Sequence, residues 1–197
     1  MESRNLMLLS WLAVLVVAEE PPSFCKLDCP KYQLVEQYDK FEHRIYEESR
    51  WVTTSLNADH YMFGIMNSFR HLFKYISGEN SEGLKINMTV PVLTVVPLIK
   101  PPTVNATMSF FVPHALENPP TPSDPAVYLK NSPPMSVYVK TFGGYAFDYT
   151  YSKKAKALAE ELRTLGLQFD DSFVLRAGYD APFKLFDRHN EVWFLAK

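Results

Sequence analysis

The chain has 197 residues, with 20 Lys and Arg against 22 Asp and Glu, which gives a formal net charge of −2. Because 47% of the residues are hydrophobic and 14% are aromatic, there is enough apolar material for a folded core, and disordered, collagen-like and coiled-coil classes are excluded. The near-neutral charge gives no long-range attraction to a phosphate backbone, so nucleic acid is not expected as a partner.

Residues 1–18 have the pattern of a secretory signal peptide. Arg4 supplies a positive charge, an apolar run covers 6–17, and Val16-Val17-Ala18 resembles a small-residue cleavage site. A signal anchor is the weaker alternative, because a run of about 12 residues is shorter than the about 20 that a spanning helix needs. We therefore expect a protein that is secreted or lies in the lumen of the secretory pathway, with no stable membrane insertion.

Residues 19–31 form an N-terminal extension that holds both cysteines of the chain, Cys25 and Cys29. In an oxidising compartment such a pair favours a local disulfide, and a metal site is the weaker alternative because no second pair of ligands lies nearby. Two sequons, at Asn87 and Asn105, agree with a secretory route and predict a glycoprotein. Asn87 lies inside an expected strand, whereas Asn105 lies in an expected loop.

Residues 32–197 predict a domain in which one order of elements occurs twice. In the first half, strand-type residues over 41–56 are followed by a helix over 59–77 and by strands over 85–96 and 108–112. The element order, rather than residue identity, indicates an internal duplication.

The second half repeats this order after a connection rich in proline. Residues 113–134 hold seven of the 15 prolines, which excludes a regular helix or sheet interior and predicts a long, stiff connection. The elements expected after it are strands over 135–142 and 145–149, a helix over 153–165, and strands over 173–177 and 192–196.

The first helix carries the clearest periodic pattern. Apolar residues recur at steps of three and four and form one stripe, made of Met62, Ile65, Met66, Phe69, Leu72, Phe73 and Ile76. Beside this stripe, Phe63, Arg70 and Lys74 line up as a ridge of one aromatic residue and two cations. An apolar slot edged by cations suits a flat ligand with carboxylate tails, although core packing with snorkelling cations explains the same pattern.

Several segments along the chain resemble the SOUL heme-binding protein family. They include Phe69-Arg-His-Leu-Phe-Lys-Tyr-Ile-Ser-Gly-Glu-Asn80, Lys85-Ile-Asn-Met-Thr-Val-Pro-Val92, Ala177-Gly-Tyr-Asp-Ala-Pro-Phe-Lys184 and the closing Arg188-His-Asn-Glu-Val-Trp193. The resemblance covers residues 32–197. It implies an α+β fold, a distorted antiparallel β-barrel of two pseudo-symmetric halves, each with one α-helix packed outside.

The resemblance also implies a protein that binds heme or protoporphyrin non-covalently. Because no catalytic motif is present in the sequence, we do not expect an enzyme, and we expect a monomer. In this family the tetrapyrrole lies in a surface groove beside the first helix and the loop before the last strand, with lysines at the propionates. The matching positions here are Met66, Phe69, Phe73 and Lys74 on the helix and Phe183 and Lys184 in the loop. The lysines match in type, whereas the apolar positions depart from a relative's residues and keep the groove apolar with another shape.

A protein ligand to iron is not required by this interpretation. If a histidine does ligate iron, His43 is the candidate, because some family members have a histidine at the position of Ile45, and residues two apart share a strand face.

Two other functions remain open. A secreted protein of the same fold could bind another amphipathic small molecule or a protein partner. By loose analogy with related barrel domains, Glu191 near Tyr179 and Trp193 could serve as a hydrolase carboxylate, although no catalytic motif accompanies it. The alternative role for Glu191 is structural, in an internal ion pair with Arg188.

Overall fold

The structure, a computed structural model, describes residues 21–56, 61–100, 102 and 104–197. The expected signal peptide at 1–18 lies outside the described residues. Within them the elements are β1 (Tyr32–Gln37), β2 (Glu42–Tyr46), β3 (Ser49–Ser55), α1 (Tyr61–Ile76), β4 (Val92–Pro97), β5 (Thr107–Phe111), β6 (Val127–Ser132), β7 (Met135–Phe142), α2 (Asp148–Thr164), β8 (Phe173–Gly178) and β9 (Asn190–Leu195).

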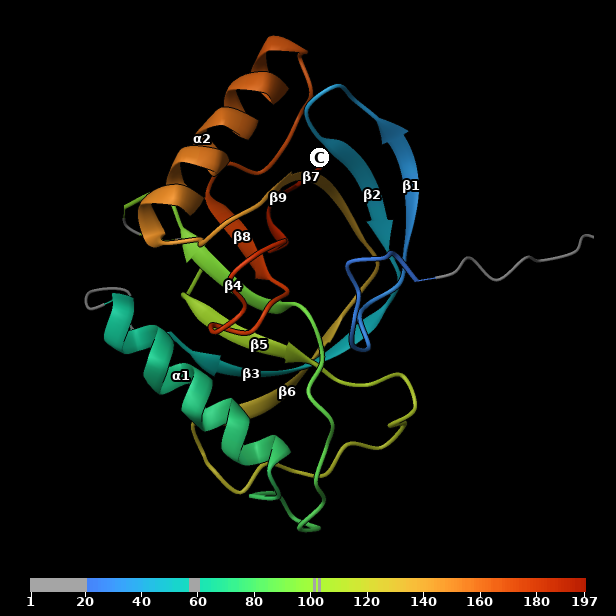
Figure 1. The fold of residues 1–197 in the computed structure, drawn as a ribbon, viewed down its shortest axis with the longest axis vertical. Coiled ribbons are helices and arrows are strands. Elements are labelled where there is room, and N and C mark those ends of the chain that lie inside the picture. The colour runs from blue at the N-terminus through green and yellow to red at the C-terminus, as the bar shows by residue number, and fades with distance from the viewer. Residues whose placement is uncertain (1–20, 57–60, 101, 103) are drawn as a thin grey trace, which may run out of the picture.

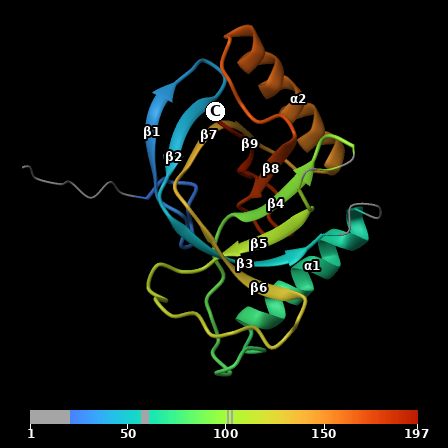
Figure 2. The same cartoon turned by 180° about the vertical axis from the view of Figure 1, so that it is seen from behind.

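The strands form one antiparallel sheet that curls into a half-barrel (Figures 1 and 2). Its strand order is β1-β2-β7-β9-β8-β4-β5-β3-β6. From β2 to β6 this order is symmetric about the β8–β4 pair, with β2, β3, α1, β4 and β5 in one half and β6, β7, α2, β8 and β9 in the other. The first strand of each half pairs with the second strand of the other, so the expected α+β fold of two pseudo-symmetric halves is confirmed.

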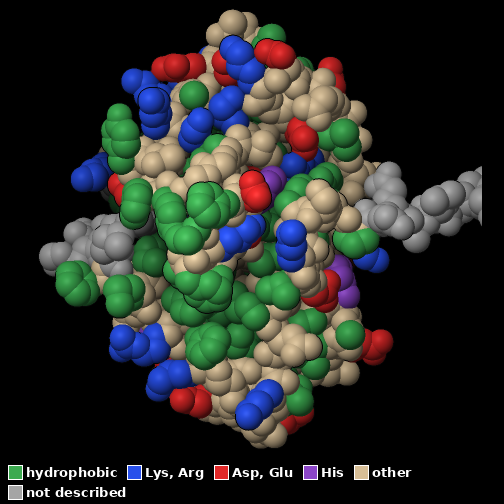
Figure 3. Space-filling view, viewed as in Figure 1, with side chains coloured by type: hydrophobic (Ala, Val, Ile, Leu, Met, Phe, Trp, Pro, Cys, Tyr) green, Lys and Arg blue, Asp and Glu red, His purple; other side chains and the backbone are tan. Residues whose placement is uncertain are grey.

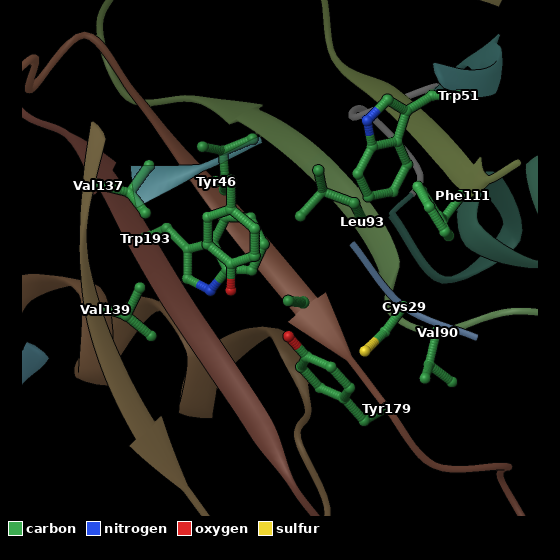
Figure 4. Packing of buried hydrophobic residues seen from close by; sticks show 12 residues of the cluster. Cys29, Tyr46, Trp51, Val90, Leu93, Phe111, Val137, Val139, Tyr179 and Trp193 are labelled. Atoms are coloured by element: carbon green, nitrogen blue, oxygen red, sulfur yellow. The ribbon is translucent and has the colours of Figure 1, made fainter. Parts of the chain in front are cut away.

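Alternating side chains divide the strands between an inner and an outer core. On β7, Val137 and Val139 belong to the inner cluster, whereas Tyr138 between them belongs to the cluster beneath α2. On β9, Trp193 points inward and Phe194 outward in the same way. Figure 4 shows the inner cluster between the walls of the sheet. Because successive strand side chains point to opposite faces, both helices cover outer faces of the half-barrel.

Each helix packs mainly on the outer face of its own half, and α1 also contacts β6 of the other half. α1 packs on β3, β5 and β6, and α2 packs on β7 and β9. The buried side of α2 consists of Ala155, Leu158, Ala159 and Leu162, at the spacing of one helix face. None of the described helices is both long and apolar enough to cross a membrane.

Three expected elements of the second half and its connection differ from the structure. Residues 127–132, within the connection expected over 113–134, form β6, an edge strand that fits between Pro125 and Pro133 and pairs with β3. The strand expected over 145–149 is absent, because α2 begins at Asp148, five residues before its expected start at Lys153.

The first half differs in the extent of its strands. The segment 41–56 forms two strands, β2 and β3. A further strand, β1, precedes them and was not predicted from the sequence. The strand expected over 85–96 begins only at Val92. Before Val92 the backbone amides do not pair with a neighbouring strand: the amide of Ile86 donates to the carbonyl of Ile76, and the amide of Val90 donates to the carbonyl of Asp28.

Candidate functional site

The outer side of α1 exposes large apolar side chains. Leu72, on its buried side, packs into the cluster beneath the helix. Met66 and Phe73, in contrast, are 60% and 49% exposed. The ring of Phe69 lies between these two environments, with its centroid 5.9 Å from that of Phe73 and 5.2 Å from that of Phe110 in β5. Met66, Phe69 and Phe73 therefore form an apolar band along one flank of α1.

The expected ridge of Phe63, Arg70 and Lys74 lies next to this band and is exposed along its whole length. Phe63 is 78% exposed. The ammonium of Lys74 donates to the carboxylate of Glu79 at 3.4 Å. A carboxylate ligand at Lys74 would therefore share or replace an existing surface ion pair, which contributes little to stability.

The loop between β8 and β9 carries a second exposed apolar group. Phe183, Leu185 and Phe186 have 84%, 65% and 78% of their surfaces exposed. Beneath them, the ammonium of Lys184 donates to the carboxylate of Asp180 and to the carbonyl of Asp187, both at 2.6 Å. Polar contacts within the loop therefore stabilise its conformation, whereas its apolar side chains are exposed to solvent.

Polar contacts also fix the base of this loop. Arg188 donates to the carbonyls of Ala181 at 2.8 Å and Lys184 at 2.7 Å. Partial burial would raise the pKa of Asp180, but the bonds from Lys184 and from the amide of His189 outweigh it, so that the pKa lies below its usual value. Asp180 is therefore ionised at neutral pH and keeps Lys184 in place.

The α1 band and the β8–β9 loop share one face of the molecule. Figure 3 shows hydrophobic side chains gathered over both elements, with Lys and Arg side chains around them. We call this surface the aromatic face and define it as Phe63, Met66, Phe69, Phe73, Phe183, Leu185 and Phe186. The six site residues named from the sequence therefore divide into Met66, Phe69, Phe73 and Lys74 on α1 and Phe183 and Lys184 on the loop.

His43 lies elsewhere. It is in β2, where its Nε2 lies 2.7 Å from the hydroxyl of Ser136 and its ring packs against Tyr138. β2 pairs with β1 and β7, whereas α1 packs on β3, β5 and β6. The structure therefore does not bring His43 together with the α1 residues.

A buried charged cluster lies inside the half-barrel, centred on Glu191. One carboxylate oxygen accepts from Arg44 at 3.0 Å and lies 2.7 Å from Nε2 of His189. The other accepts from the hydroxyl of Tyr179 at 2.9 Å and from the indole nitrogen of Trp193 at 2.8 Å. Tyr179 and Trp193 are both visible in the inner cluster of Figure 4. With four partners, Glu191 is satisfied although it is fully buried.

The electrostatics of this cluster favour an ionised carboxylate. Burial would raise the pKa of Glu191, but the hydrogen bond from His189 and the charge of Arg44 outweigh it, so that the pKa lies below its ordinary 4.5. Burial and the same carboxylate raise the pKa of Tyr179 well above 10.0. Both groups therefore keep one protonation state at neutral pH, which is typical of a structural centre rather than of an acid–base catalyst.

The ion pair considered from the sequence between Arg188 and Glu191 is wrong. Arg188 donates to backbone carbonyls of its own loop, and the arginine that pairs with Glu191 is Arg44. Sequence reasoning missed this partner because it lies in β2, 147 positions away. The available signal was Arg44 itself, a cation in a strand two residues from Tyr46, whose hydroxyl it also contacts at 3.1 Å.

The N-terminal extension covers this cluster. Cys25 and Cys29 form a disulfide with 6.0 Å between their Cα atoms. Next to it, the ring of Phe24 packs on both Tyr179 and His189. Asp28 fixes the extension to the body of the domain, because its carbonyl accepts from the amide of Val90 and its carboxylate from the amide of His114.

The two sequon asparagines are accessible. Asn87 and Asn105 are both exposed. Contrary to expectation, Asn87 lies in irregular chain before β4 rather than inside a strand, because that strand begins only at Val92.

Within the part of the chain that the structure describes, no group of three or more His, Cys, Asp or Glu residues could hold a metal ion.

Comparison with known proteins identifies the relatives of this fold. Residues 27–195 match the family model described as SOUL heme-binding protein. Heme-binding protein 2 of Mus musculus is 32% identical over 87% of this chain and 87% of its own length. Heme-binding protein 2 of Homo sapiens is 33% identical over 82% of this chain and 80% of its own.

Solved structures with the same fold are much more distant in sequence. The crystal structure of the EcmrR C-terminal domain superposes with a TM-score of 0.56 over 84% of this chain and 98% of that one. The sequence identity is 11%, so this likeness concerns the fold alone.

Proposed function

Because the chain belongs to the SOUL heme-binding protein family, we propose that it binds a tetrapyrrole, heme or protoporphyrin, reversibly and non-covalently on one part of the aromatic face. The proposed ring contacts are Met66, Phe69, Phe73 and Phe183, with Lys74 and Lys184 at the propionates. The observation that carries the proposal is the exposure of Met66 and Phe73 next to a lysine on α1. Monomeric soluble proteins rarely expose contiguous apolar surface of this kind without a ligand or partner for it. A flat, apolar ring with carboxylate tails matches an apolar band edged by ammonium groups.

Burial of the ring supplies most of the proposed affinity. Removing about 300 Å² of apolar surface from water at about 25 cal/mol/Å² contributes roughly 7 kcal/mol, before the cost of association. Each exposed ion pair between a lysine and a propionate adds only about 0 to 1 kcal/mol. Lys74 and Lys184 therefore orient the ring and select for carboxylates, and each does so in competition with a carboxylate of the chain.

Iron ligation is not needed in this proposal. Each described histidine has a hydrogen-bond partner at one ring nitrogen, which leaves at most the other nitrogen for iron. The partners are Ser136 for His43, Asp124 for His71, the carbonyl of Cys29 for His114, and Glu191 for His189. A site without a strong axial ligand suits carriage or buffering of the tetrapyrrole rather than oxygen chemistry.

We also propose that the protein is made in the secretory pathway. The signal-like pattern of residues 1–18, the Cys25–Cys29 disulfide and the exposed sequons at Asn87 and Asn105 support this assignment. Peptide mass mapping of the protein collected from culture medium tests it. We expect chains that begin after residue 18 and glycans on the asparagines, and retention of the full chain inside cells would contradict secretion.

The proposed activity is tested by titrating the protein in parallel with hemin and with iron-free protoporphyrin. Absorbance follows the ligand, and quenching of the buried Trp51 and Trp193 follows the protein. We expect saturable one-to-one binding of both ligands with similar affinity, because the ring and its propionates are recognised. Binding of hemin alone would show that iron is ligated. Binding of neither would favour the alternative, another amphipathic molecule or a protein partner.

A further inference from the structure

The outermost side chains of the aromatic face are largely exposed to solvent and belong to separate elements. Phe183 and Phe186 are 84% and 78% exposed at the β8–β9 loop, and Phe63 is 78% exposed on α1. Exposed apolar side chains on separate elements are suited to inserting into the headgroup region of a lipid bilayer. A rigid, flat ligand can contact only part of them.

A third element adds exposed aromatic residues next to the aromatic face. Phe147 and Tyr149, at the start of α2, are 64% and 76% exposed. The chain before them is joined to the β8–β9 loop, because the guanidinium of Arg188 lies 4.7 Å from the ring centre of Tyr145 and Asn190 donates to the carbonyl of Gly144 at 2.9 Å. The chain that leads into α2 is therefore in direct contact with the end of the β8–β9 loop and the start of β9.

Cations without acidic partners surround these aromatic residues. Arg70 on α1 and Lys153 and Lys156 on α2 are exposed, and none of them forms an ion pair with the described residues. Figure 3 shows Lys and Arg side chains both over α2 and next to the hydrophobic surface of α1. The whole chain has a net charge of −2, so an attraction to an anionic surface has to come from such local cations.

We propose that the aromatic face docks the protein peripherally on an anionic lipid surface. The exposed aromatic rings enter the headgroup region, and Arg70, Lys153 and Lys156 meet the lipid phosphates and carboxylates. A second copy of the chain is a poorer occupant, because a symmetric contact through this face would oppose the same cations. Docking goes beyond the proposed function: it would let an apolar ring pass between a lipid phase and the protein without crossing water.

Vesicle flotation tests the docking with residues 19–197, the secreted form proposed above, which contains every strand and helix described and lacks the apolar run at 6–17. Vesicles of phosphatidylcholine alone are compared with vesicles that contain about 30% phosphatidylserine. We expect binding to the anionic vesicles only, with a loss when salt rises from about 0.05 M to about 0.5 M, because the Debye length shortens.

Two variants separate the apolar from the electrostatic contribution. Leu185→Ser with Phe186→Ser should weaken anionic vesicle binding at least about tenfold, since both side chains would otherwise be buried in lipid. Lys153→Glu with Lys156→Glu should weaken it as well and changes only exposed positions of α2. The matched control is Leu34→Ser with Val35→Ser, which removes two exposed apolar side chains from β1 and should leave binding unchanged.

The inference is overturned if neutral and anionic vesicles bind equally, if neither binds, or if the loop variant behaves like the β1 control. Sedimentation that shows self-association of the parent, lost in the loop variant, would overturn it in favour of a second copy. Hemin titration without vesicles is independent of these outcomes, because Leu185 and Phe186 are not among the proposed ring contacts. Vesicle binding by a chain that binds no tetrapyrrole would leave the docking standing.

Discussion

The phenyl ring of Phe24 lies flat on the imidazole of His189, with 4.0 Å between ring centroids and 3° between ring planes. The same imidazole contacts the buried carboxylate of Glu191 at 2.7 Å. The N-terminal extension is therefore packed directly on the charged cluster of the half-barrel and shields one of its members from water.

Replacing Phe24 by alanine should destabilise the domain. The ring is partly buried and stacks on a residue of the cluster, so a loss of about 2 kcal/mol in the free energy of unfolding is expected, below the range for fully buried phenylalanines. Urea unfolding followed by tryptophan fluorescence measures it. Leu27→Ala, at a 47% exposed position of the same extension, is the control and should change stability by less than about 0.5 kcal/mol.

Removing the disulfide should have a similar effect. The Cys25–Cys29 loop is short, with a sequence separation of 4, and chain-entropy reasoning gives a loss of about 2 kcal/mol for Cys25→Ala with Cys29→Ala. The same urea titration measures it. A reducing agent should lower the stability of the parent by a comparable amount and should not affect the double variant, and an equal effect on both would contradict the assignment.

Breaking the buried ion pair should be the most damaging single change. Arg44→Met leaves the Glu191 carboxylate in the interior without its cationic partner, so the free energy of unfolding should fall by about 3 to 5 kcal/mol. Thermal and urea unfolding measure the loss. Arg163→Met, which removes a surface pair with Asp171 at 3.0 Å, serves as the control and should cost less than about 1 kcal/mol. A comparable loss in both variants would contradict a structural role for the cluster.

Stability should decrease in acid. The pKa of Glu191 is lowered in the folded protein from an ordinary 4.5, so its contribution is complete above that value and is lost as the pH falls through the folded pKa. Asp180, whose pKa is lowered from 3.8, adds to the same trend. Urea unfolding at successive pH values should show a decline that begins near pH 4.5 and is shallower in Glu191→Gln. If the free energy of unfolding declined equally with falling pH in both proteins, Glu191 would not be the cause of the acid sensitivity.

Tetrapyrrole binding should depend more on Phe73 than on Lys74. Phe73→Ala removes ring surface from the apolar band, whereas Lys74→Ala removes an exposed ammonium that already pairs with Glu79, and exposed pairs contribute only about 0 to 1 kcal/mol. Hemin titration of both variants should therefore show the larger loss of affinity for Phe73→Ala. Tyr128→Ala, at a 45% exposed position in β6, is the control. Equal or reversed losses would contradict the proposed dominance of ring burial.

The repeated order of elements was predictable, because alternation and helical periodicity are local properties of the chain. The same periodicity predicted the apolar stripe and the ridge of α1 around Arg70 and Lys74. The exchange of β2 and β6 between the two halves was not predictable, because strand pairing depends on the path of the whole chain. β6 in particular was hidden by the prolines around it, which mark its ends rather than exclude it.

The charged cluster around Glu191 was not predictable either, because it also depends on how distant strands pair. Glu191 and Arg44 meet only because β2 pairs with β7 and β7 pairs with β9, in registers that place both side chains on the inner face. A one-residue shift in either pairing would turn one of the two charges outward. The sequence shows two charged residues inside strands, and the register decides that they are partners.

The central position of β8 and β9 has a consequence for synthesis on the ribosome. Without these two strands, the pairing order separates β1, β2 and β7 from β4, β5, β3 and β6. Because β8 and β9 follow all the other described strands along the chain, neither group can join the other until these two strands have left the exit tunnel. Until that moment, the apolar inner faces of both groups stay open to water.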